Sequence, residues 1–207
     1  MKNTKLVLGI PSCGTVDWRF ASSLMALRLL DGTRIVWSVR TMIDAARNNI
    51  VKAALEEECT HVLMIDDDMT FEPDFALKLL EHDVDIVGGL AFKRVPDFMP
   101  CVFKEKEPKQ FFPILPTVFQ EVDAIGSGGI LIKREVFEKI TYPWFETYYD
   151  DTKRHWSVDM DFCIKAKKTG FKIFVDPACE MGHMGNSQVI KKEHFLNYNK
   201  PKSDTSQ

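Results

Sequence analysis

The sequence predicts an α/β protein with a mainly parallel central sheet, flanking helices and a small antiparallel portion. In the first ninety residues, short apolar runs alternate with segments whose apolar residues recur at helical spacing, a pattern typical of β-α-β units. The middle of the chain differs, because five prolines between residues 94 and 120 exclude a long helix there. A length of 207 residues fits one domain with a sizeable core.

The predicted elements of the first half alternate regularly between strands and helices. Strands are expected at residues 5–11, 34–39, 61–65 and 85–92, and helices at residues 17–30, 42–57 and 73–82. Pro73 would occupy the first position of its helix, where proline is favoured.

The second half is predicted to be less regular. In chain order we expect a loop with a short hairpin at 94–120, strand-like alternation at 121–133, a short helix from Arg134, an aromatic loop, a helix from Met160 to Gly170, and a last strand at 172–175. Residues 1–190 are predicted to form the domain, and residues 191–207 the end of a helix and a polar tail or linker.

Composition excludes several classes of function. A net charge of −3 and a pI near 6.0 lack the basic excess that nucleic-acid binding requires. No apolar run approaches the roughly 18 residues of a membrane span, and no signal peptide is apparent, so we expect a cytoplasmic protein. The five cysteines lie far apart and form no C-x-x-C pair, which argues against a disulfide framework or a zinc ribbon.

Three consecutive aspartates follow the strand predicted at residues 61–65, in the stretch HVLMIDDDMTFEPD. If strand geometry continued, Asp66 and Asp68 would share a face and Asp67 would point away. Two such carboxylates repel each other unless a divalent cation binds between them. The carboxyl end of a parallel strand is also where open α/β sheets bind ligands.

Two other interpretations of the aspartates remain open from the pattern alone. They could cap the following helix or lie in a solvated turn. The residues DDDMT also fit the D-x-D-x-T pattern of haloacid-dehalogenase-type phosphatases, whose first aspartate is phosphorylated. That pattern normally lies on the first strand and needs a downstream G-D-x-x-x-D motif, whereas here two strands precede it and the motif is absent.

An ordered set of motifs resembles the GT-A-type glycosyltransferases, in particular small family-2-like members of phages and large viruses. The motifs are VLMIDDDMTFEPD, DIVGG, AIGSGGILIKREVFEKI, the D-x-D-F-C from Asp159, GFKIFVDP and GHMG, and they span residues 5–186. The resemblance implies a GT-A (Rossmann-like) fold and, for a viral protein, the host cytoplasm.

The resemblance also implies a metal and donor site. Asp66 and Asp68 would bind a divalent ion that bridges the diphosphate of a UDP-sugar, and Asp67 would lie near the ribose or sugar. His183 would complete the metal site, and an imidazole ligand favours Mn²⁺, with Mg²⁺ as the alternative, over Ca²⁺. A lone histidine is otherwise more often a surface or core residue.

Asp159 corresponds to the general base that takes the proton of the acceptor hydroxyl in inverting transfer. The family usually has a glutamate before this aspartate, and here Val158 replaces it, which puts acceptor orientation in doubt. Asp161 is an alternative base. An aspartate in the first turn of a helix can also serve only as a cap.

The remaining donor contacts are implied by position in the family pattern. Pro11 and Ser12 follow the first strand, where these folds contact the nucleotide, and Arg47 resembles an arginine directed towards it. Gly128 and Gly129 would let the backbone approach the donor sugar, although a β-bulge explains them as well. Aromatic residues of the loop before Asp159 could stack on an acceptor sugar or belong to the core: Trp144, Phe145, Tyr148, Tyr149 and Trp156.

Together these features predict a metal-dependent enzyme that moves a hexose or deoxyhexose from a UDP-sugar to a glycan hydroxyl, with inversion. A phosphatase and a non-catalytic nucleotide-sugar-binding module are the alternatives. The expected partners are a nucleotide-sugar donor and a glycan or glycoconjugate acceptor, without nucleic acid or a membrane span. The sequence does not indicate an oligomeric state.

Overall fold

The computed structural model describes residues 4–185 and 188–200 and has the predicted α/β architecture. In these residues the central sheet has seven strands, in the spatial order β2 (Arg34–Val39), β1 (Leu6–Ser12), β3 (His61–Ile65), β10 (Gly129–Lys133), β5 (Ile86–Leu90), β13 (Ile173–Glu180) and β8 (Gln120–Val122). Because only β10 and β8 pair antiparallel with their neighbours, the other five strands share one direction. The sheet is therefore mainly parallel.

Small antiparallel sheets extend this framework. One contains β15 (Val189–Ile190), β14 (Gly182–Met184) and β4 (Met69–Thr70), and another contains β7 (Gln110–Pro113), β6 (Val102–Glu107) and β9 (Ala124–Ile125). A third consists of β11 (Tyr148–Tyr149) and β12 (His155–Trp156). The pair β6 and β7 is the hairpin predicted in the proline-rich segment.

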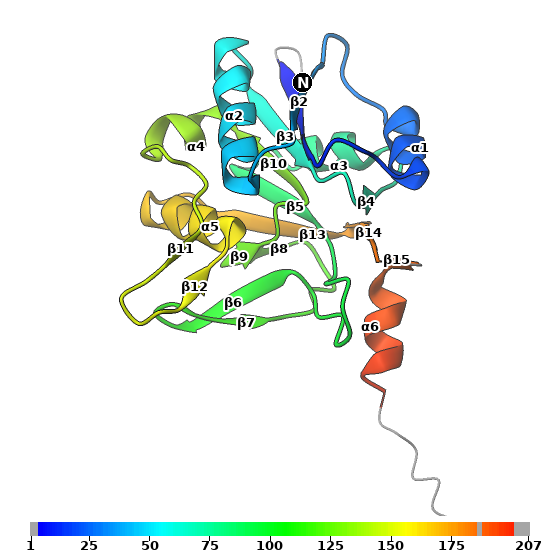
Figure 1. The fold of residues 1–207 in the computed structure, drawn as a ribbon, viewed down its shortest axis with the longest axis vertical. Coiled ribbons are helices and arrows are strands. Elements are labelled where there is room, and N and C mark those ends of the chain that lie inside the picture. The colour runs from blue at the N-terminus through cyan, green and yellow to red at the C-terminus, as the bar shows by residue number, and fades with distance from the viewer. Residues whose placement is uncertain (1–3, 186–187, 201–207) are drawn as a thin grey trace, which may run out of the picture.

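Helices cover both faces of the central sheet (Figure 1). One face packs against α2 (Ile43–Glu56), α4 (Arg134–Lys139) and α5 (Val158–Lys168), and the other against α1 (Trp18–Ala26) and α3 (Phe75–Glu81). Within β3, Val62 and Met64 enter one core and Leu63 and Ile65 the other. This double cover explains why the strands are continuous apolar runs.

Several predicted boundaries were wrong. The helix predicted at 17–30 ends at Ala26, and Pro73 precedes the N-cap residue Asp74 of α3 instead of occupying its first position. The helix predicted from Met160 begins at Val158, because the Ser157 side chain caps it by accepting a hydrogen bond from the Met160 amide.

The end of the chain holds more regular structure than predicted. The strand expected at 172–175 continues to Glu180, and β14 and β15 follow it. The predicted tail begins with α6 (Lys192–Tyr198), and residues 201–207 lie outside the described residues. The division into a domain at 1–190 and a tail at 191–207 stays a prediction.

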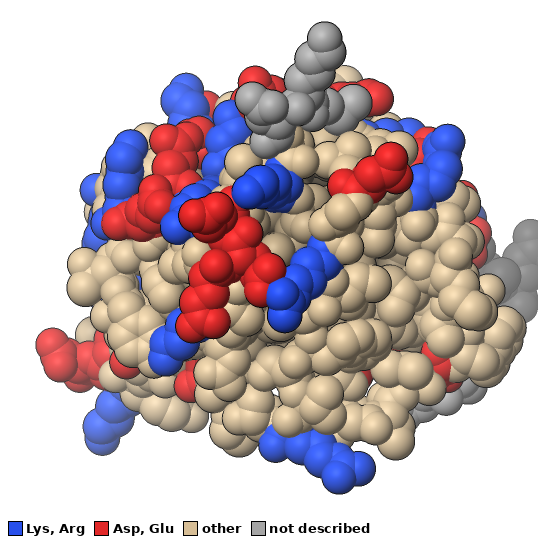
Figure 2. Space-filling view, turned by 90° about the horizontal axis from the view of Figure 1, so that it is seen from above, with Lys and Arg blue, Asp and Glu red and all other residues tan. Residues whose placement is uncertain are grey.

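The face that Figure 2 shows carries acidic and basic side chains in close proximity, without one broad basic area. Arg34 of β2, for example, pairs with Glu57 at the end of α2. Among the described residues, no helix is both long and apolar enough to cross a membrane.

Candidate functional site

The three aspartates lie in a turn that joins β3 to β4. Because β3 ends at Ile65, residues 66–68 are not in a strand, and the strand alternation expected for the three aspartates does not apply to them. All three line one hollow of about 250 Å³. The Asp66 amide donates to the Gly128 carbonyl at 3.0 Å, which fixes the start of the turn against β10.

The hollow lies at the carboxyl ends of β1 and β3, as expected for a ligand site in an open α/β sheet. Its other lining residues come from the end of β1 and the start of α2: Pro11, Ser12, Cys13, Thr41, Ile43 and Ala46. The Cys13 amide donates to Asp67 Oδ2 at 3.3 Å, and the Gly14 amide donates to the Ser12 hydroxyl at 3.1 Å. The structure therefore brings Pro11 and Ser12 to the aspartates.

The Arg47 guanidinium lies between the Asp66 and Asp159 carboxylates and forms ion pairs with both. The side chain is only 2% exposed, so Arg47 is a buried residue of α2 and not a solvated one. Nη2 lies 3.0 Å from Asp66 Oδ2 and 3.8 Å from Asp159 Oδ1, and Nη1 donates to the Ser127 carbonyl at 3.4 Å. Burial lowers the pKa of Arg47, but the carboxylates outweigh this effect and keep the guanidinium charged. Burial raises the pKa of Asp66 to about 6, although the charge of Arg47 opposes the rise.

Asp159 lies in the first turn of α5, and its carboxylate accepts a hydrogen bond from the Ser127 hydroxyl. Val158, where the family has a glutamate, is 6% exposed and belongs to the hydrophobic core. A charged side chain would be costly in this position. Ser127 and Arg47, instead of a neighbouring glutamate, therefore orient the Asp159 carboxylate.

Asp68 and His183 lie together, as the resemblance implied. His183 Nε2 is 3.2 Å from Asp68 Oδ2, and Nδ1 donates to the Phe92 carbonyl at 2.8 Å. Arg94 donates to the same Asp68 oxygen at 2.9 Å. Burial raises the pKa of Asp68, whereas His183 and Arg94 lower it by more. Burial lowers the pKa of His183, but Asp68 and the Phe92 carbonyl raise it above its ordinary value.

These residues fit a divalent cation in their chemistry. Asp66 Oδ1 is buried and makes no hydrogen bond, although Arg47 Nη2 lies 3.0 Å from it, and Asp68 and His183 would add an oxygen and a nitrogen ligand. In the part of the chain that the structure describes, no three His, Cys, Asp or Glu side chains are placed as a metal cluster. Arg47 and Arg94 instead supply the positive charge beside the two carboxylates.

Other predicted residues lie apart from this cluster. Asp161 is 3% exposed and pairs with Lys165 at 2.6 Å, so its placement gives no support to a role as base. Gly128 contacts the site, because an added Cβ would lie 3.3 Å from Asp66 Oδ2. Gly129 faces the core, where an added Cβ would overlap Met181, so close packing accounts for this glycine.

The aromatic residues of the loop before α5 are mostly core. Trp144, Phe145 and Trp156 are at most 8% exposed, so of the two alternatives, core packing or stacking on an acceptor sugar, these three residues follow the first. Asn48 of α2 holds this loop by accepting from the amides of Trp144 and Phe145. Tyr149, by contrast, is 71% exposed.

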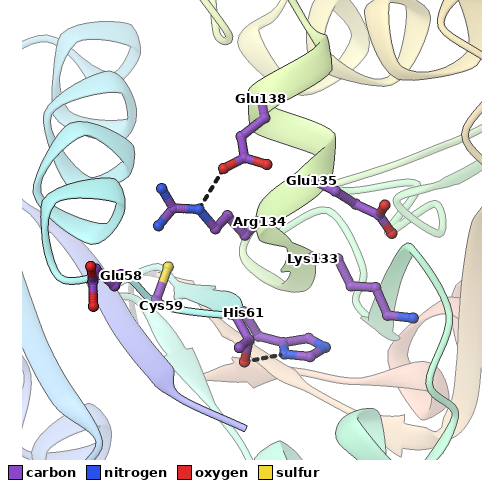
Figure 3. A pocket seen from close by; sticks show the side chains of 8 residues that line it. Glu58, Cys59, His61, Lys133, Arg134, Glu135 and Glu138 are labelled. Atoms are coloured by element: carbon purple, nitrogen blue, oxygen red, sulfur yellow. Dashed lines mark hydrogen bonds and ion pairs between the residues drawn. The ribbon is translucent and has the colours of Figure 1, made fainter. Parts of the chain in front are cut away.

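A second hollow, of about 520 Å³, lies at the opposite end of β3 (Figure 3). Both of its basic side chains are paired: Arg134 with Glu138, and Lys133 with Asp83 outside the hollow. Among the side chains drawn in Figure 3, His61 makes a hydrogen bond only with the hydroxyl of the adjacent Thr60. The aspartate hollow is therefore the better candidate site.

Ser127 and Arg94 were missed by the sequence reasoning. Ser127 lies inside the GSGG motif, in which a role at the site was predicted only for glycines. Arg94 follows the predicted strand 85–92, so it comes from the same carboxyl edge of the sheet as the aspartates. That shared edge was the available signal for Arg94.

Comparison with known proteins supports the fold. No protein-family model and no curated protein sequence matches this chain. The crystal structure of A197 from STIV matches with a TM-score of 0.68 and 20% sequence identity over 92% of each chain. The structure of GalNAc-T7 with UDP, GalNAc and Mn²⁺ matches with a TM-score of 0.55 and 11% identity, over 88% of this chain and 44% of that chain. These likenesses and the mainly parallel sheet show that the chain has a GT-A-like α/β fold.

Proposed function

We propose that this chain is a metal-dependent glycosyltransferase that moves a hexose or deoxyhexose from a UDP-sugar to a glycan hydroxyl. The observation that carries the proposal is the convergence of Asp66, Asp68, His183 and Asp159 beside the hollow at the carboxyl ends of β1 and β3. GalNAc-T7, whose structure contains UDP, GalNAc and Mn²⁺, supports this class of donor through its shared fold.

The donor would bind with its diphosphate near Asp66 and Asp68. These carboxylates and His183 would hold Mn²⁺ or Mg²⁺, which when bound neutralises the charge that develops on the departing diphosphate. Pro11 and Ser12 would contact the nucleoside, and Asp67 its ribose or sugar. Gly128 supports this arrangement, because a larger residue there would crowd Asp66.

Asp159 would act as the base. The acceptor hydroxyl forms a bond to the anomeric carbon, the bond from that carbon to the diphosphate breaks, and Asp159 takes the hydroxyl proton. The Ser127 hydroxyl and the Arg47 guanidinium hold one Asp159 oxygen, and the side chain is 31% exposed, which leaves access for an acceptor. Attack opposite the leaving group gives inversion.

The first experiment measures UDP binding by calorimetry, with and without Mn²⁺, on the natural protein and on Asp68→Asn. We expect binding that depends on both the metal and Asp68. Asp83→Asn is the matched control, because Asp83 pairs with Lys133 at the other end of the sheet and should not affect UDP binding. Absence of UDP binding in the natural protein would overturn the proposal.

The second experiment separates the enzyme from the two alternatives. Asp159→Asn should retain UDP affinity and lose transfer from UDP-sugars to glycan acceptors by about 10²–10⁴-fold, the usual contribution of a general base. A binding module would transfer nothing in either form. A phosphatase would instead hydrolyse p-nitrophenyl phosphate with Mg²⁺ and lose this activity in Asp66→Asn.

A further inference from the structure

The segment that carries Arg94 is held firmly next to the aspartates. It leaves β5 and returns as a tight loop, in which Phe92 pairs with Pro100 and the Lys93 amide donates to the Met99 carbonyl at 2.9 Å. Phe98 in this loop packs edge to face against Tyr198 of α6, with ring centroids 5.7 Å apart. Arg94 therefore projects from an anchored position.

The only hydrogen bond of the Arg94 side chain within the described residues joins Nη1 to Asp68 Oδ2 at 2.9 Å. The side chain is 56% exposed, and among the described residues only one of its five N–H donors has a protein acceptor. His183 contacts the same Asp68 oxygen at 3.2 Å. One carboxylate oxygen thus contacts both the Arg94 guanidinium and the His183 imidazole, at the position where a metal ligand is proposed.

We propose that Arg94 is the counter-ion of Asp68 in the donor-free protein and a ligand of the donor diphosphate in the complex. The inference rests on the proposed function and names a residue that selects nucleoside diphosphates. A divalent cation held by Asp68 would repel the guanidinium, so Arg94 would leave Asp68 when the metal binds. The released guanidinium lies beside the site with donors that match phosphate oxygens in pairs.

This assignment predicts two effects of opposite sign in one variant. In Arg94→Gln, Mn²⁺ alone should bind about 3–10-fold more tightly, because a competing cation is gone. At saturating Mn²⁺, UDP should bind about tenfold more weakly, the order expected when one charge-assisted hydrogen bond is lost. UMP, which lacks the second phosphate, should be affected less than UDP.

The test is calorimetric titration of MnCl₂, and then of UDP and UMP at saturating Mn²⁺. Arg28→Gln is the matched control, because Arg28 is 63% exposed and lies 3.8 Å from Asp74, away from the hollow. Thermal unfolding verifies that each variant is folded, and the exposure of Arg94 predicts little loss of stability.

Each result decides the inference. Tighter Mn²⁺ binding with weaker UDP binding supports it. Weaker binding of both ligands, or unchanged UDP affinity, overturns it while the proposed function stands, provided that the natural protein binds UDP with Mn²⁺. A natural protein that binds neither Mn²⁺ nor UDP overturns the proposed function and this inference together.

Discussion

Replacing Arg47 with methionine removes a buried charge and keeps most of the side-chain volume. Removing one partner of a buried ion pair costs about 3–5 kcal/mol. The expected cost is smaller here, because the partner side chains Asp66 and Asp159 are 27% and 31% exposed and stay partly hydrated. We expect Arg47→Met to lower the free energy of unfolding by about 2–3 kcal/mol, or the melting temperature by roughly 4–12 °C at this chain length.

The same variant should respond more strongly to a divalent cation. Without Arg47, the carboxylates of Asp66 and Asp159 lose the positive charge that lies between them. Because a ligand that binds only the folded state stabilises it, MnCl₂ should raise the melting temperature of Arg47→Met more than that of the natural protein. Thermal unfolding by circular dichroism at pH 7.5, with EDTA or with MnCl₂, measures both effects.

The matched control is Arg34→Met, which breaks a pair whose arginine is 61% exposed. A surface pair is worth about 0–1 kcal/mol, and this control should not respond to MnCl₂. If Arg47→Met lost no more stability than Arg34→Met, or if MnCl₂ affected both equally, the role of Arg47 as the internal counter-charge would be refuted.

Three further predictions concern the framework of the site. Gly129→Ala should lower the free energy of unfolding by about 1–3 kcal/mol, because the added methyl group overlaps Met181 in the core; urea denaturation measures it, and an unchanged midpoint would contradict this packing. Asn48→Ala should cost roughly 2–4 kcal/mol in the same assay, because two amides and one carbonyl of the buried loop lose their partner, and a loss under about 0.5 kcal/mol would exclude this anchoring role. Burial raises the pKa of Asp176, but hydrogen bonds from His82, the Ala178 amide and Cys179 lower it by more. The stability that this ionised carboxylate contributes is therefore present above the ordinary aspartate pKa and is lost as the pH falls through the lower pKa of the folded state. Asp176→Asn should therefore be about 1–3 kcal/mol less stable than the natural protein at pH 7. This difference should shrink as the pH falls from roughly 4 to 2, and a difference that stayed constant over this range would contradict the assignment.

Much of the fold could be predicted from the sequence because both faces of the sheet are covered. Strands buried on both faces must be apolar throughout, so β1, β3 and β5 stood out as runs between helical segments. The order of the strands could not be predicted, because β10 inserts between β3 and β5 through contacts between residues distant in sequence. The short strands β4, β14 and β15 likewise depend on pairing that periodicity does not reveal.

The sequence by itself determined the chemical character of the site: an aspartate cluster after a buried strand, with Asp159 and His183 further along a family-like pattern. Only the tertiary structure decided which charges meet. Local pattern does not encode the burial of Arg47 between Asp66 and Asp159, the Arg94 contact with Asp68, or the Ser127 hydrogen bond to Asp159. The same holds for the burial of Trp144 and Trp156. The physical reason is that side-chain type sets which interactions a residue can make, whereas burial and the distance to a counter-charge depend on how distant segments pack.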